Sequence, residues 1–550
     1  MKPSHGAFVI MKLMILEEIK KWLEKELGEA GAVSFVENLQ FGDVTTNLAL
    51  SKDNPKKSAE EFAEKLNKNK PDFISEISIA GPGFINFSLS QKFLTSSDRY
   101  SRIRENTGIL SGKKIIVEYT DPNPFKEFHI GHLMSNAIGE AIAGLIEATG
   151  AEVKRACYQG DVGMHVAKAL WKGDYALGAK AYEENDLAKT EIQEINKKIY
   201  DKSDSEINLQ YEEGKKKSLE SFEKIYKKLG TKFSDGFMFF ESASGPKGLE
   251  IVKENTPKIF QESDGAIIYK GEERDKKLHT RVFVNKEGLP TYEAKELGLL
   301  QLKQEKEKNI AKSIVITGNE VNDYFKVVMS SAKEISETKD LAEKTEHIGH
   351  GMLRLPTGKM SSRTGDVVTA EFLINEVKQT ALKLMEKSGR AGVNEDLAEK
   401  IAIGAIKFSI LRQHPGKDII FDINKSISFE GDSGPYLMYT HARANSLLTK
   451  GREEGLSPSP ITDFFGSKDL MRLLIRFNDV VHRSAEETSP NHLVEYLLEI
   501  SGGFNSWYAK EQVITENKEE SAQKLSMVEL FKNTLFNGLT ILAIHAPEKM

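Results

Sequence analysis

The sequence predicts a multidomain α/β protein, with a doubly wound parallel sheet in the centre, a small α+β domain before it and an all-α domain after it. Residues 73–90 contain two strand-like runs around a Gly-Pro-Gly turn. Residues 111–161 give a strand, a loop, a helix and a second strand, which is the βαβ unit of a parallel sheet. From about residue 395 the apolar residues recur at helical spacing. The expected domains are therefore 1–105, 106–394 and 395–550.

The N-terminal domain is expected to begin with an amphipathic helix over 12–29, because Ile15, Ile19 and Leu23 lie at helical spacing. A second, largely polar helix is expected over 57–68, before the two strands. The expected fold of this domain is therefore α+β.

In the central domain, the run IIVEYT (115–120) has the β-branched, apolar pattern of a buried strand. After the loop DPNPFKEF, a helix begins near His132 and ends near Gly150, a typical C-cap residue. The run EVKRACYQGD then begins the next strand. A charged helical insertion is expected over 172–230, and further strands are expected at 280–284 and 313–317.

The composition is that of a globular protein, with 39% hydrophobic and 29% charged residues among 550. The net charge of −6 means that any nucleic-acid surface must be a local basic patch. The single cysteine, Cys157, excludes an intrachain disulfide and a cysteine-based zinc site, and it favours a reducing cytoplasm. No apolar run reaches the roughly 20 residues that a membrane span needs, so no membrane partner is expected.

Two histidines, His129 and His132, flank Gly131 where the central helix begins. Helix N-termini at the carboxyl ends of parallel strands bind anionic groups, and a glycine there allows a nucleotide to approach the backbone. Two imidazoles three residues apart can face the same side and donate hydrogen bonds to phosphate oxygens. A metal site would need a third ligand, which the sequence does not place nearby. A helix start with two solvated histidines is the other alternative.

A second motif, GKMSSRTGD (358–366), favours phosphate chemistry. Cations and hydroxyls in a glycine-punctuated loop suit a clamp that closes on a polyphosphate, although a polar surface turn has a similar composition. The candidate ATP-binding residues are Gly131, Lys359, Met360, Ser361, Ser362 and Arg363.

The string HIGH, followed about 230 residues later by KMSSR, resembles the signature of the class I aminoacyl-tRNA synthetases. Other stretches resemble the arginyl-tRNA synthetases, in a discontinuous match from about residue 35 to residue 550. They are FGDVTTNLAL (41–50), GPGFINFSLS (81–90), VEYTDPNPFKEFHIGH (117–132), YQGDVGMH (158–165), SFEGDSGPYLMYTHAR (428–443) and the chain end NGLTILAIHAPEKM. The resemblance implies a Rossmann-type catalytic domain with helical insertions, an N-terminal domain that contacts the tRNA elbow and an anticodon-binding C-terminal domain.

The substrate pocket of such an enzyme can be argued from chemistry, since a guanidinium needs shielded carboxylates with fork geometry. Tyr292 and Glu296, four residues apart on an expected helix, share one face. By resemblance, Glu241 and Glu296 hold the guanidinium and Tyr292 lines the pocket. By the same resemblance, Asn123 binds the α-amino or carboxylate end of arginine, and Glu118 lies near it.

Three positions depart from the family pattern. Asp121 stands where a small residue is usual, so that it either binds the substrate ammonium or reshapes the pocket. Glu296 replaces the usual aspartate, and Ser362 replaces the second lysine of KMSKS. In arginyl enzymes that lack this lysine, one just before HIGH is thought to compensate; here it is Lys126, for which an ordinary exposed loop lysine is the alternative.

The resemblance implies ATP-dependent activation of L-arginine and transfer to the 2′-hydroxyl of the terminal adenosine of tRNA(Arg). His129, His132 and Lys126 are the expected catalytic residues, and ATP with Mg²⁺, without zinc, is the expected cofactor set. A cytoplasmic monomer is expected. RNA contacts are expected from aromatic and basic residues. The candidates are Phe84 and Asn86 in the N-terminal domain, and Tyr436, His441, Arg443, Asn505, Trp507 and Tyr508 in the C-terminal domain.

Three alternatives remain open. Another nucleotidyltransferase with an HxGH signature is usually much shorter, and a class I synthetase of different specificity, such as the cysteinyl enzyme, normally carries zinc-ligand cysteines. A synthetase-like tRNA-binding protein without catalysis is the third, because Asp121, Glu296 and Ser362 leave room for it. Arginine-dependent pyrophosphate exchange separates an enzyme from such a binding protein.

Overall fold

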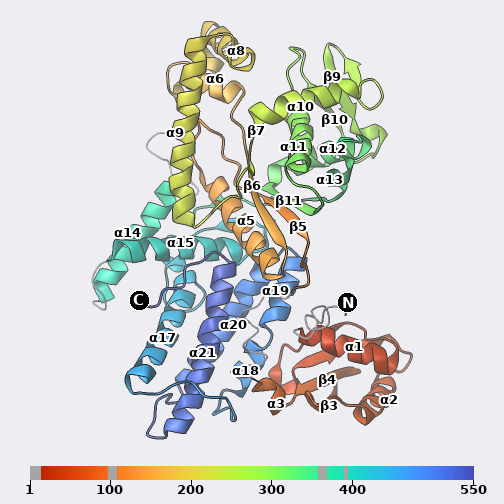
Figure 1. Cartoon of the computed structure of the whole chain (residues 1–550), viewed down its shortest axis with the longest axis vertical. Helices are drawn as coiled ribbons and strands as arrows, with labels where there is room; N and C mark the ends of the chain where they lie inside the picture. The colour runs from red at the N-terminus through yellow and green to blue at the C-terminus, as the bar shows by residue number, and fades with distance from the viewer. Residues whose placement is uncertain (1–13, 97–107, 357–367, 389–393) are drawn as a thin grey trace, which may run out of the picture.

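The structure is a computed structural model that describes residues 14–96, 108–356, 368–388 and 394–550 (Figure 1). In the N-terminal region, two helices pack against an antiparallel sheet with the strand order β1-β2-β4-β3. Leu23, Leu66 and Phe87 from these layers are buried in one core. The elements are α1 (Ile15–Leu27), β1 (Val33–Phe35), β2 (Val44–Thr46), α2 (Pro55–Lys68), β3 (Ile74–Ala80), β4 (Phe84–Leu89) and α3 (Gln91–Leu94).

This region lies against two helices of the C-terminal region, α18 (Lys468–Leu474) and α19 (Phe477–Glu486) (Figure 1). The carboxylate of Asp479 accepts hydrogen bonds of 3.1 Å from the backbone N–H groups of Ile15 and Leu16. It thereby satisfies donors at the start of α1 that the side chain of Met14 does not cap. The N-terminal region and the C-terminal region are therefore joined by specific polar contacts.

The central sheet is parallel throughout and has the strand order β12-β11-β5-β6-β7. Ile115 and Val117 of the middle strand pack in the core that contains α5, whereas Ile116 packs in the core on the opposite face. The chain reverses its direction of strand addition between β5 and β11, which is where ligands bind in doubly wound sheets. The elements are β5 (Lys114–Glu118), α5 (Ile130–Ala148), β6 (Glu152–Gln159), β7 (Met238–Phe240), β11 (Ile310–Gly318) and β12 (Thr345–His350).

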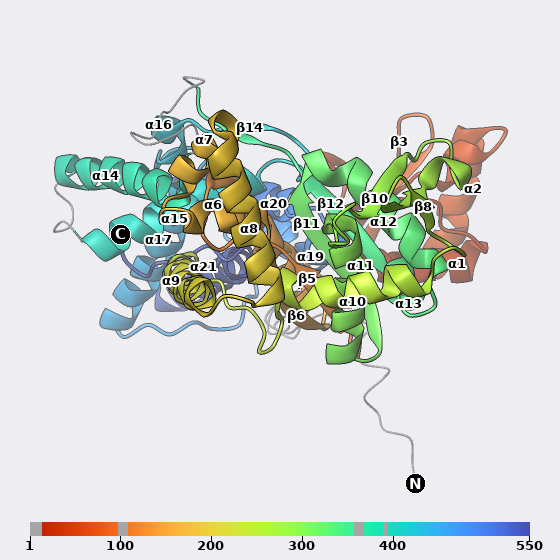
Figure 2. The ribbon, with the colours of Figure 1, turned by 90° about the horizontal axis from the view of Figure 1, so that it is seen from above.

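A helical insertion extends from the end of β6 and returns to β7 along the long helix α9 (Figures 1 and 2). Its core contains Val166, Ile192, Ile199 and Tyr211. The elements are α6 (Met164–Leu170), α7 (Tyr175–Glu184), α8 (Asp186–Asp201) and α9 (Ser205–Leu229). The insertion is therefore a packed unit with its own small core.

On the other face of the sheet, α10 and α11 pack with a three-stranded sheet of order β10-β9-β8. The strand expected at 280–284 is present as β10, but it pairs antiparallel with β9 and does not join the parallel sheet. The elements are α10 (Glu241–Glu254), β8 (Gln261–Ser263), β9 (Ala266–Lys270), β10 (Thr280–Val284), α11 (Tyr292–Lys306), α12 (Asn322–Glu334) and α13 (Lys339–Glu343).

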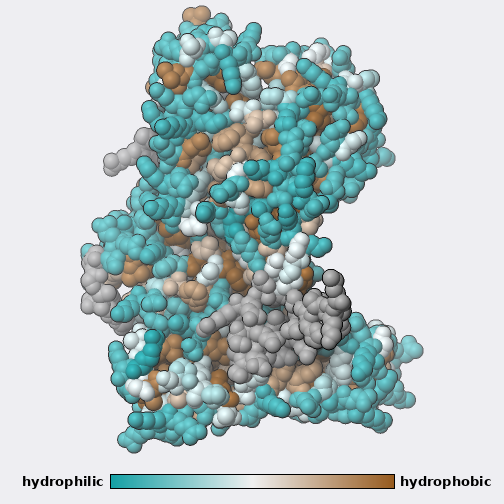
Figure 3. Space-filling model, in the orientation of Figure 1, coloured by the Kyte–Doolittle hydropathy of each residue, from teal (hydrophilic) through white to brown (hydrophobic). Residues whose placement is uncertain are grey.

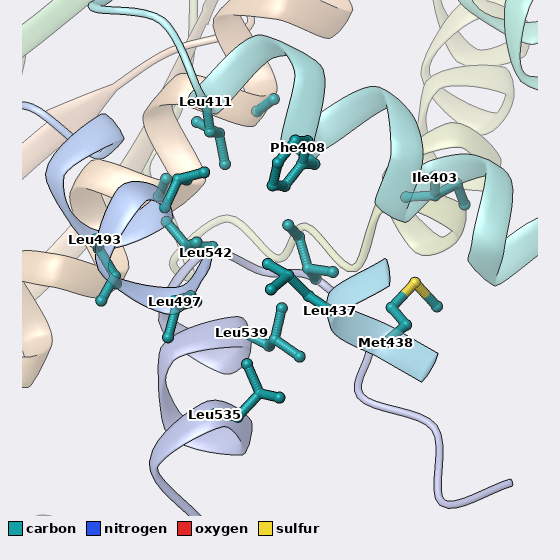
Figure 4. Packing of buried hydrophobic residues seen from close by; sticks show 14 of the residues in the cluster. Ile403, Phe408, Leu411, Leu437, Met438, Leu493, Leu497, Leu535, Leu539 and Leu542 are labelled. Carbon is teal, nitrogen blue, oxygen red and sulfur yellow. The ribbon is translucent and has the colours of Figure 1, made fainter. Parts of the chain in front are cut away.

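The C-terminal region is mainly helical, and its core runs without a break into that of α5. Figure 4 shows Leu437, Leu497 and Leu535 from three of its helices meeting in this core. A Cβ atom on Gly144 of α5 would lie 2.3 Å from the carbonyl oxygen of Ile541, so a glycine permits this close approach. The elements are α14 (Ala370–Ser388), α15 (Glu395–Leu411), α16 (Ile423–Ser426), α17 (Gly434–Glu453), α20 (Asn491–Tyr508) and α21 (Lys518–Ile541), and a two-residue strand β14 (Ile419–Ile420) that pairs with β13 (Leu353–Arg354). Among the helices that the structure describes, none is long and apolar enough to cross a membrane.

Candidate active site

The histidine pair, His129 and His132, forms the first turn of α5. Nδ1 of His129 accepts a hydrogen bond from the backbone N–H of Gly131 at 3.1 Å, and Nδ1 of His132 accepts one from the backbone N–H of His129 at 3.2 Å. The two rings stack with their centroids 3.6 Å apart. Because both Nδ1 atoms accept, each neutral ring carries its proton on Nε2, where it is a donor. A Cβ atom at position 131 would lie 2.9 Å from the His129 ring, which explains the glycine.

The environment keeps this pair uncharged. Burial lowers the pKa of His132 well below its usual value, and the charges of His129 and Lys126 lower that pKa further. Burial and the charge of Lys126 also lower the pKa of His129. At neutral pH the pair therefore presents two neutral Nε2–H donors at a helix N-terminus.

The loop between β5 and α5 holds a strained backbone. Thr120, Asp121 and Phe125 have φ angles of 81°, 44° and 68°, a left-handed region that non-glycine residues rarely adopt. The backbone N–H of Thr120 donates to Ser135 Oγ at 2.9 Å, and Asp121 Oδ1 accepts from the backbone N–H of Tyr158 at 2.7 Å. These contacts anchor the loop to α5 and to β6.

Four acidic residues form a cluster at the C-terminal end of β5 and near the N-terminal ends of α10 and α11. They are Glu118, Asp121, Glu241 and Glu296. Burial and the charge of Glu118 raise the pKa of Glu296 to about 8, and they raise the pKa of Asp121 well above its usual value. Glu118 is fully buried and lies 2.7 Å from Nζ of Lys303. The ammonium of Lys303 therefore lies among three carboxyl groups, those of Glu118, Asp121 and Glu296, and this excess of acidic groups favours the binding of a further cation.

Glu241 begins α10, where a carboxylate interacts favourably with the helix N-terminus. It is buried, and its Oε2 lies 2.5 Å from Nζ of Lys295. A Cβ atom on Gly160 would lie 2.1 Å from Oδ1 of Asn123 and 3.1 Å from Oε1 of Glu241. This glycine therefore allows Asn123 and Glu241, which are far apart in sequence, to converge on the end of β6.

Asp161, next to this glycine, fixes the start of α10. It is completely buried and accepts hydrogen bonds from the backbone N–H and the hydroxyl of Ser242, at 2.8 and 2.6 Å. It also accepts from the hydroxyl of Tyr211 at 2.9 Å and from Nζ of Lys215 at 2.7 Å, both on α9. The helical insertion and the start of α10 are thus tied to one carboxylate.

Lys126 and Tyr292 lie close enough to Glu241 for its charge to act on both of them. Burial lowers the pKa of Lys126, and the charge of Glu241 opposes that shift. Its ammonium lies 5.3 Å from the centroid of the Tyr175 ring. Tyr292 is exposed, and its ring lies 5.2 Å from Nζ of Lys295. In the view of Figure 3, less hydrophilic residues gather between the helical insertion and the region of α10 and α11.

The expected phosphate loop, with Lys359, Met360, Ser361, Ser362 and Arg363, lies outside the described residues. The segment that follows it lies against the histidine motif. The backbone N–H of Ile130 donates to the carbonyl of Val368 at 3.1 Å, and that of Ala370 donates to the carbonyl of Phe128 at 2.9 Å. The C-terminal flank of the loop therefore runs along the start of α5.

Several site residues were missed by sequence reasoning. Lys295 and Lys303 carry no motif, and only the fold places them beside carboxylates. His347 and His350 belong to a second HIGH string at the end of β12, a signal that the sequence does contain. His350 is close enough for its charge to lower the pKa of both members of the histidine pair.

The expected RNA-binding side chains fall into two groups. Asn86, His441 and Trp507 are buried, and the last two hydrogen-bond the carbonyls of Pro547 and Phe465. Their burial argues against direct contact with RNA. The half-buried side chains are those of Phe84, Tyr436, Arg443, Asn505 and Tyr508. Of these, Asn505 accepts a hydrogen bond from Arg443 and donates one to the hydroxyl of Tyr436.

Three sequence profiles match this chain. Residues 98–229 and 174–423 match the profile of the tRNA synthetases class I (R), catalytic domain. Residues 11–89 match the arginyl tRNA synthetase N terminal domain, and residues 437–550 match the DALR anticodon binding domain.

Curated relatives and solved structures agree with these profiles. The arginine–tRNA ligase of Clostridium kluyveri is 29% identical, with 98% of this chain and 100% of the relative covered. That of Fusobacterium nucleatum is also 29% identical, with 94% and 95% covered. The arginyl-tRNA synthetase structure from Thermus thermophilus has a TM-score of 0.76 at 23% identity, with 98% of this chain and 100% of that chain covered. The one from Plasmodium falciparum has a TM-score of 0.74 at 21% identity, with 98% and 99% covered.

Proposed function

The chain belongs to the class I arginyl-tRNA synthetases, and from this premise we propose how its cleft joins L-arginine to ATP and passes the arginyl group to tRNA(Arg). It is an arginine–tRNA ligase, so the question is which residues hold each substrate. The observation that carries the proposal is that Glu241 of the acidic cluster and both members of the histidine pair interact with the charge of one lysine, Lys126, at the point where the sheet reverses its strand order.

The acidic cluster holds the guanidinium of arginine. Glu241 and Glu296 supply the carboxylates, and Tyr292 covers the pocket at the solvent side. Among the described residues, the ammonium groups in salt-bridge distance of the cluster are those of Lys295, on Glu241, and Lys303, on Glu118, so a further cation favours the ionised form of the remaining carboxyl groups. Asn123, which lies beside Glu241, holds the α-amino or carboxylate end of arginine, and Asp121 holds its ammonium group.

The histidine pair and Lys126 hold the phosphates of ATP, and Gly131 allows the nucleotide to approach the start of α5. A carboxylate oxygen of arginine attacks the α-phosphorus, and the bond to the pyrophosphate oxygen breaks. The neutral Nε2–H groups and the ammonium stabilise the charge that spreads over the phosphate oxygens. The 2′-hydroxyl of the terminal adenosine then attacks the carbonyl carbon of the adenylate, and AMP leaves.

Lys359, Met360, Ser361, Ser362 and Arg363 bind the departing pyrophosphate. Mg²⁺ accompanies the nucleotide, where it neutralises phosphate charge. Among the described residues, no group of three or more histidine, cysteine or acidic side chains is arranged to hold a metal ion. No step in the proposal depends on a protein-held metal.

The RNA contacts of this proposal use accessible side chains. Phe84 contacts the tRNA elbow, and Tyr436, Arg443 and Tyr508 contact unstacked anticodon bases. We propose that the enzyme acts as a monomer, since the residues assigned to the site all come from one chain, and that it acts in the cytoplasm.

The assignment of the pocket is tested by arginine-dependent ATP–pyrophosphate exchange, measured with each amino acid in the presence of tRNA(Arg). The Glu241→Gln variant is expected to lose on the order of 10³ in kcat/KM for arginine, with the KM for ATP changed less than about twofold. Glu262→Gln, an exposed glutamate on β8, is the matched control. Arginine kinetics that stay unchanged in Glu241→Gln would place the guanidinium elsewhere.

Proton release gives a second, independent test of the acidic cluster. Glu296 is largely protonated below its pKa of about 8, and a bound guanidinium favours the ionised carboxylate. Arginine affinity is therefore expected to rise with pH, by up to about tenfold per unit below pH 8, and to level off above it. Calorimetry in two buffers of different ionisation enthalpy counts the protons. The Glu296→Gln variant is expected to lose the dependence, and an equal dependence in that variant would contradict the role.

A further inference from the structure

Lys126 follows a residue that packs against the helical insertion. Its neighbour Phe125 has a φ of 68°, which an aromatic residue adopts only when its surroundings impose it. The surroundings here are three residues of α9. Tyr211, Gly214 and Ser218 are spaced three and four apart, so they share one face of that helix.

Each of the three makes a distinct contact with Phe125. The backbone N–H of Phe125 donates to Ser218 Oγ at 3.0 Å, and the same hydroxyl donates to the carbonyl of Gly214 at 3.0 Å. The Phe125 and Tyr211 rings stack with centroids 6.1 Å apart. A Cβ atom on Gly214 would lie 2.2 Å from the Phe125 ring, so the ring packs against α9 at a position where only a glycine leaves room for it.

The position of α9 is itself fixed. The buried carboxylate of Asp161 accepts from Tyr211 and Lys215 of α9 and from Ser242 at the start of α10. A second part of the insertion contacts Lys126 itself, because the lysine ammonium lies over the ring of Tyr175 on α7. The insertion therefore contacts both the backbone before Lys126 and the ammonium at its end.

We propose that the insertion is the positioning element for Lys126: Gly214 and Ser218 set the backbone at Phe125, and the Tyr175 ring orients the ammonium toward the phosphate site. This inference rests on the proposed phosphate role of Lys126. It assigns no catalytic role to the insertion residues, which act only through the lysine.

The test compares Ser218→Ala, Gly214→Ala and Tyr175→Ala in ATP–pyrophosphate exchange with tRNA(Arg) present. Since small misplacements of a charge-stabilising group cost up to about a hundredfold, Ser218→Ala and Gly214→Ala are expected to lower the exchange kcat by roughly 10- to 100-fold. The KM for arginine is expected to stay within about twofold. Tyr175→Ala is expected to lower kcat several-fold, on the order of the loss of one cation–π contact, and Tyr175→Phe to restore it.

Two controls match these changes. Leu177→Ala removes an exposed side chain from the same helix as Tyr175, and Gly502→Ala adds a Cβ atom in a helix where nothing lies within 4 Å. Both are expected to retain full activity. The thermal unfolding temperature of every variant shows whether a loss of activity comes from a loss of folding. If Gly214→Ala does not fold, Ser218→Ala still tests the proposal.

The decisive measurement is the double variant with Lys126→Ala. If the insertion acts through Lys126, then Ser218→Ala costs nothing further once the lysine is absent. Losses that multiply in the double variant would overturn the positioning role. If Lys126→Ala is impaired while Ser218→Ala and Gly214→Ala are not, the positioning proposal alone is wrong. If Lys126→Ala keeps full activity, the phosphate role fails and the positioning role fails with it.

Discussion

The tetrapeptide HIGH occurs twice in this protein, at 129–132 and at 347–350, and the two copies are built differently. The first begins α5, and both Nδ1 atoms accept from backbone N–H groups. The second ends β12, where Nδ1 of His350 lies 2.7 Å from the carbonyl of Gly351 and must donate to it. His347 stacks on Phe325 at 4.2 Å, and its Nε2 lies 2.7 Å from the Thr317 hydroxyl.

The difference lies in where each ring keeps its proton. A helix start offers free N–H donors, so the rings of the first copy turn their acceptor nitrogens inward and leave Nε2–H as the donor. At the strand end Nδ1–H of His350 donates a hydrogen bond to a carbonyl, which leaves Nε2 as an acceptor when the ring is neutral. Only the first copy therefore presents two donors to a phosphate, although the four letters are identical.

The largest expected effect is that of His132→Asn. An asparagine oxygen can replace the Nδ1 acceptor for the N–H of His129, but it leaves no donor at the Nε2 position. Loss of one preorganised donor costs on the order of 10² to 10³ in kcat. Pyrophosphate exchange measures it, with the exposed His414→Asn as control. A kcat within about threefold of the unaltered enzyme would remove His132 from the phosphate site.

A smaller effect is expected for His129→Asn. Asparagine is a good N-cap residue and keeps the bond to Gly131, so the helix start is preserved while the ring donor is lost. Because this ring is less buried than that of His132, its hydrogen bond is weaker, and we expect a kcat lower by about 10- to 100-fold. Stopped-flow measurement of adenylate formation checks this. A loss greater than that of His132→Asn would reverse the proposed ranking.

His350→Asn tests the second HIGH copy in the same way. Burial lowers the pKa of His350, so the ring is uncharged at pH 7.5, and its removal is expected to change kcat by less than about fivefold at that pH. Exchange kinetics with His132→Asn assayed in parallel give the contrast directly. Equal losses in the two variants would mean that both copies contact the phosphates.

The smallest effect concerns His347, and it is on stability. Burial lowers its pKa from 6.5 to about 4, so the unfolded chain binds more protons between these values. Its contribution to stability is therefore complete above pH 6.5 and is lost as the pH falls toward 4. His347→Gln is expected to flatten the acid side of the stability profile while kcat at pH 7.5 stays within about twofold. Urea unfolding at pH 5 and 7.5 measures the free energy of unfolding of both proteins. If the difference between the two pH values is the same in His347→Gln as in the unaltered enzyme, the assignment is contradicted.

The sequence allowed the central strands to be predicted because buried parallel strands are continuous apolar runs, as in IIVEYT. It also allowed the histidine motif to be placed at a helix start. The antiparallel partner of β10 was not predictable, because strand pairing depends on residues far away in the chain. Lys295 and Lys303 were missed for the same reason, since a buried lysine and an exposed one look identical until the fold supplies a carboxylate.

Burial also limited the expected RNA contacts. His441 and Trp507 have the right chemistry for an RNA surface, but their polar atoms bond carbonyls of the protein itself. An aromatic residue in a helix can pack in a protein core or stack on an RNA base, and only the packing in the folded structure shows which of the two it does. The second HIGH string shows the same limit, because its sequence is identical to that of the first and only its hydrogen bonds show that its rings are held differently.

The central claim is that one cleft holds the triphosphate at the first HIGH copy and the guanidinium at the acidic cluster. A crystal structure with L-arginine and a non-hydrolysable ATP analogue tests it most directly. The account predicts phosphate oxygens within hydrogen-bond reach of Nε2 of His129 and His132, and the guanidinium between the carboxylates of Glu241 and Glu296. Phosphates seated on His347 and His350, or a guanidinium remote from both glutamates, would contradict it.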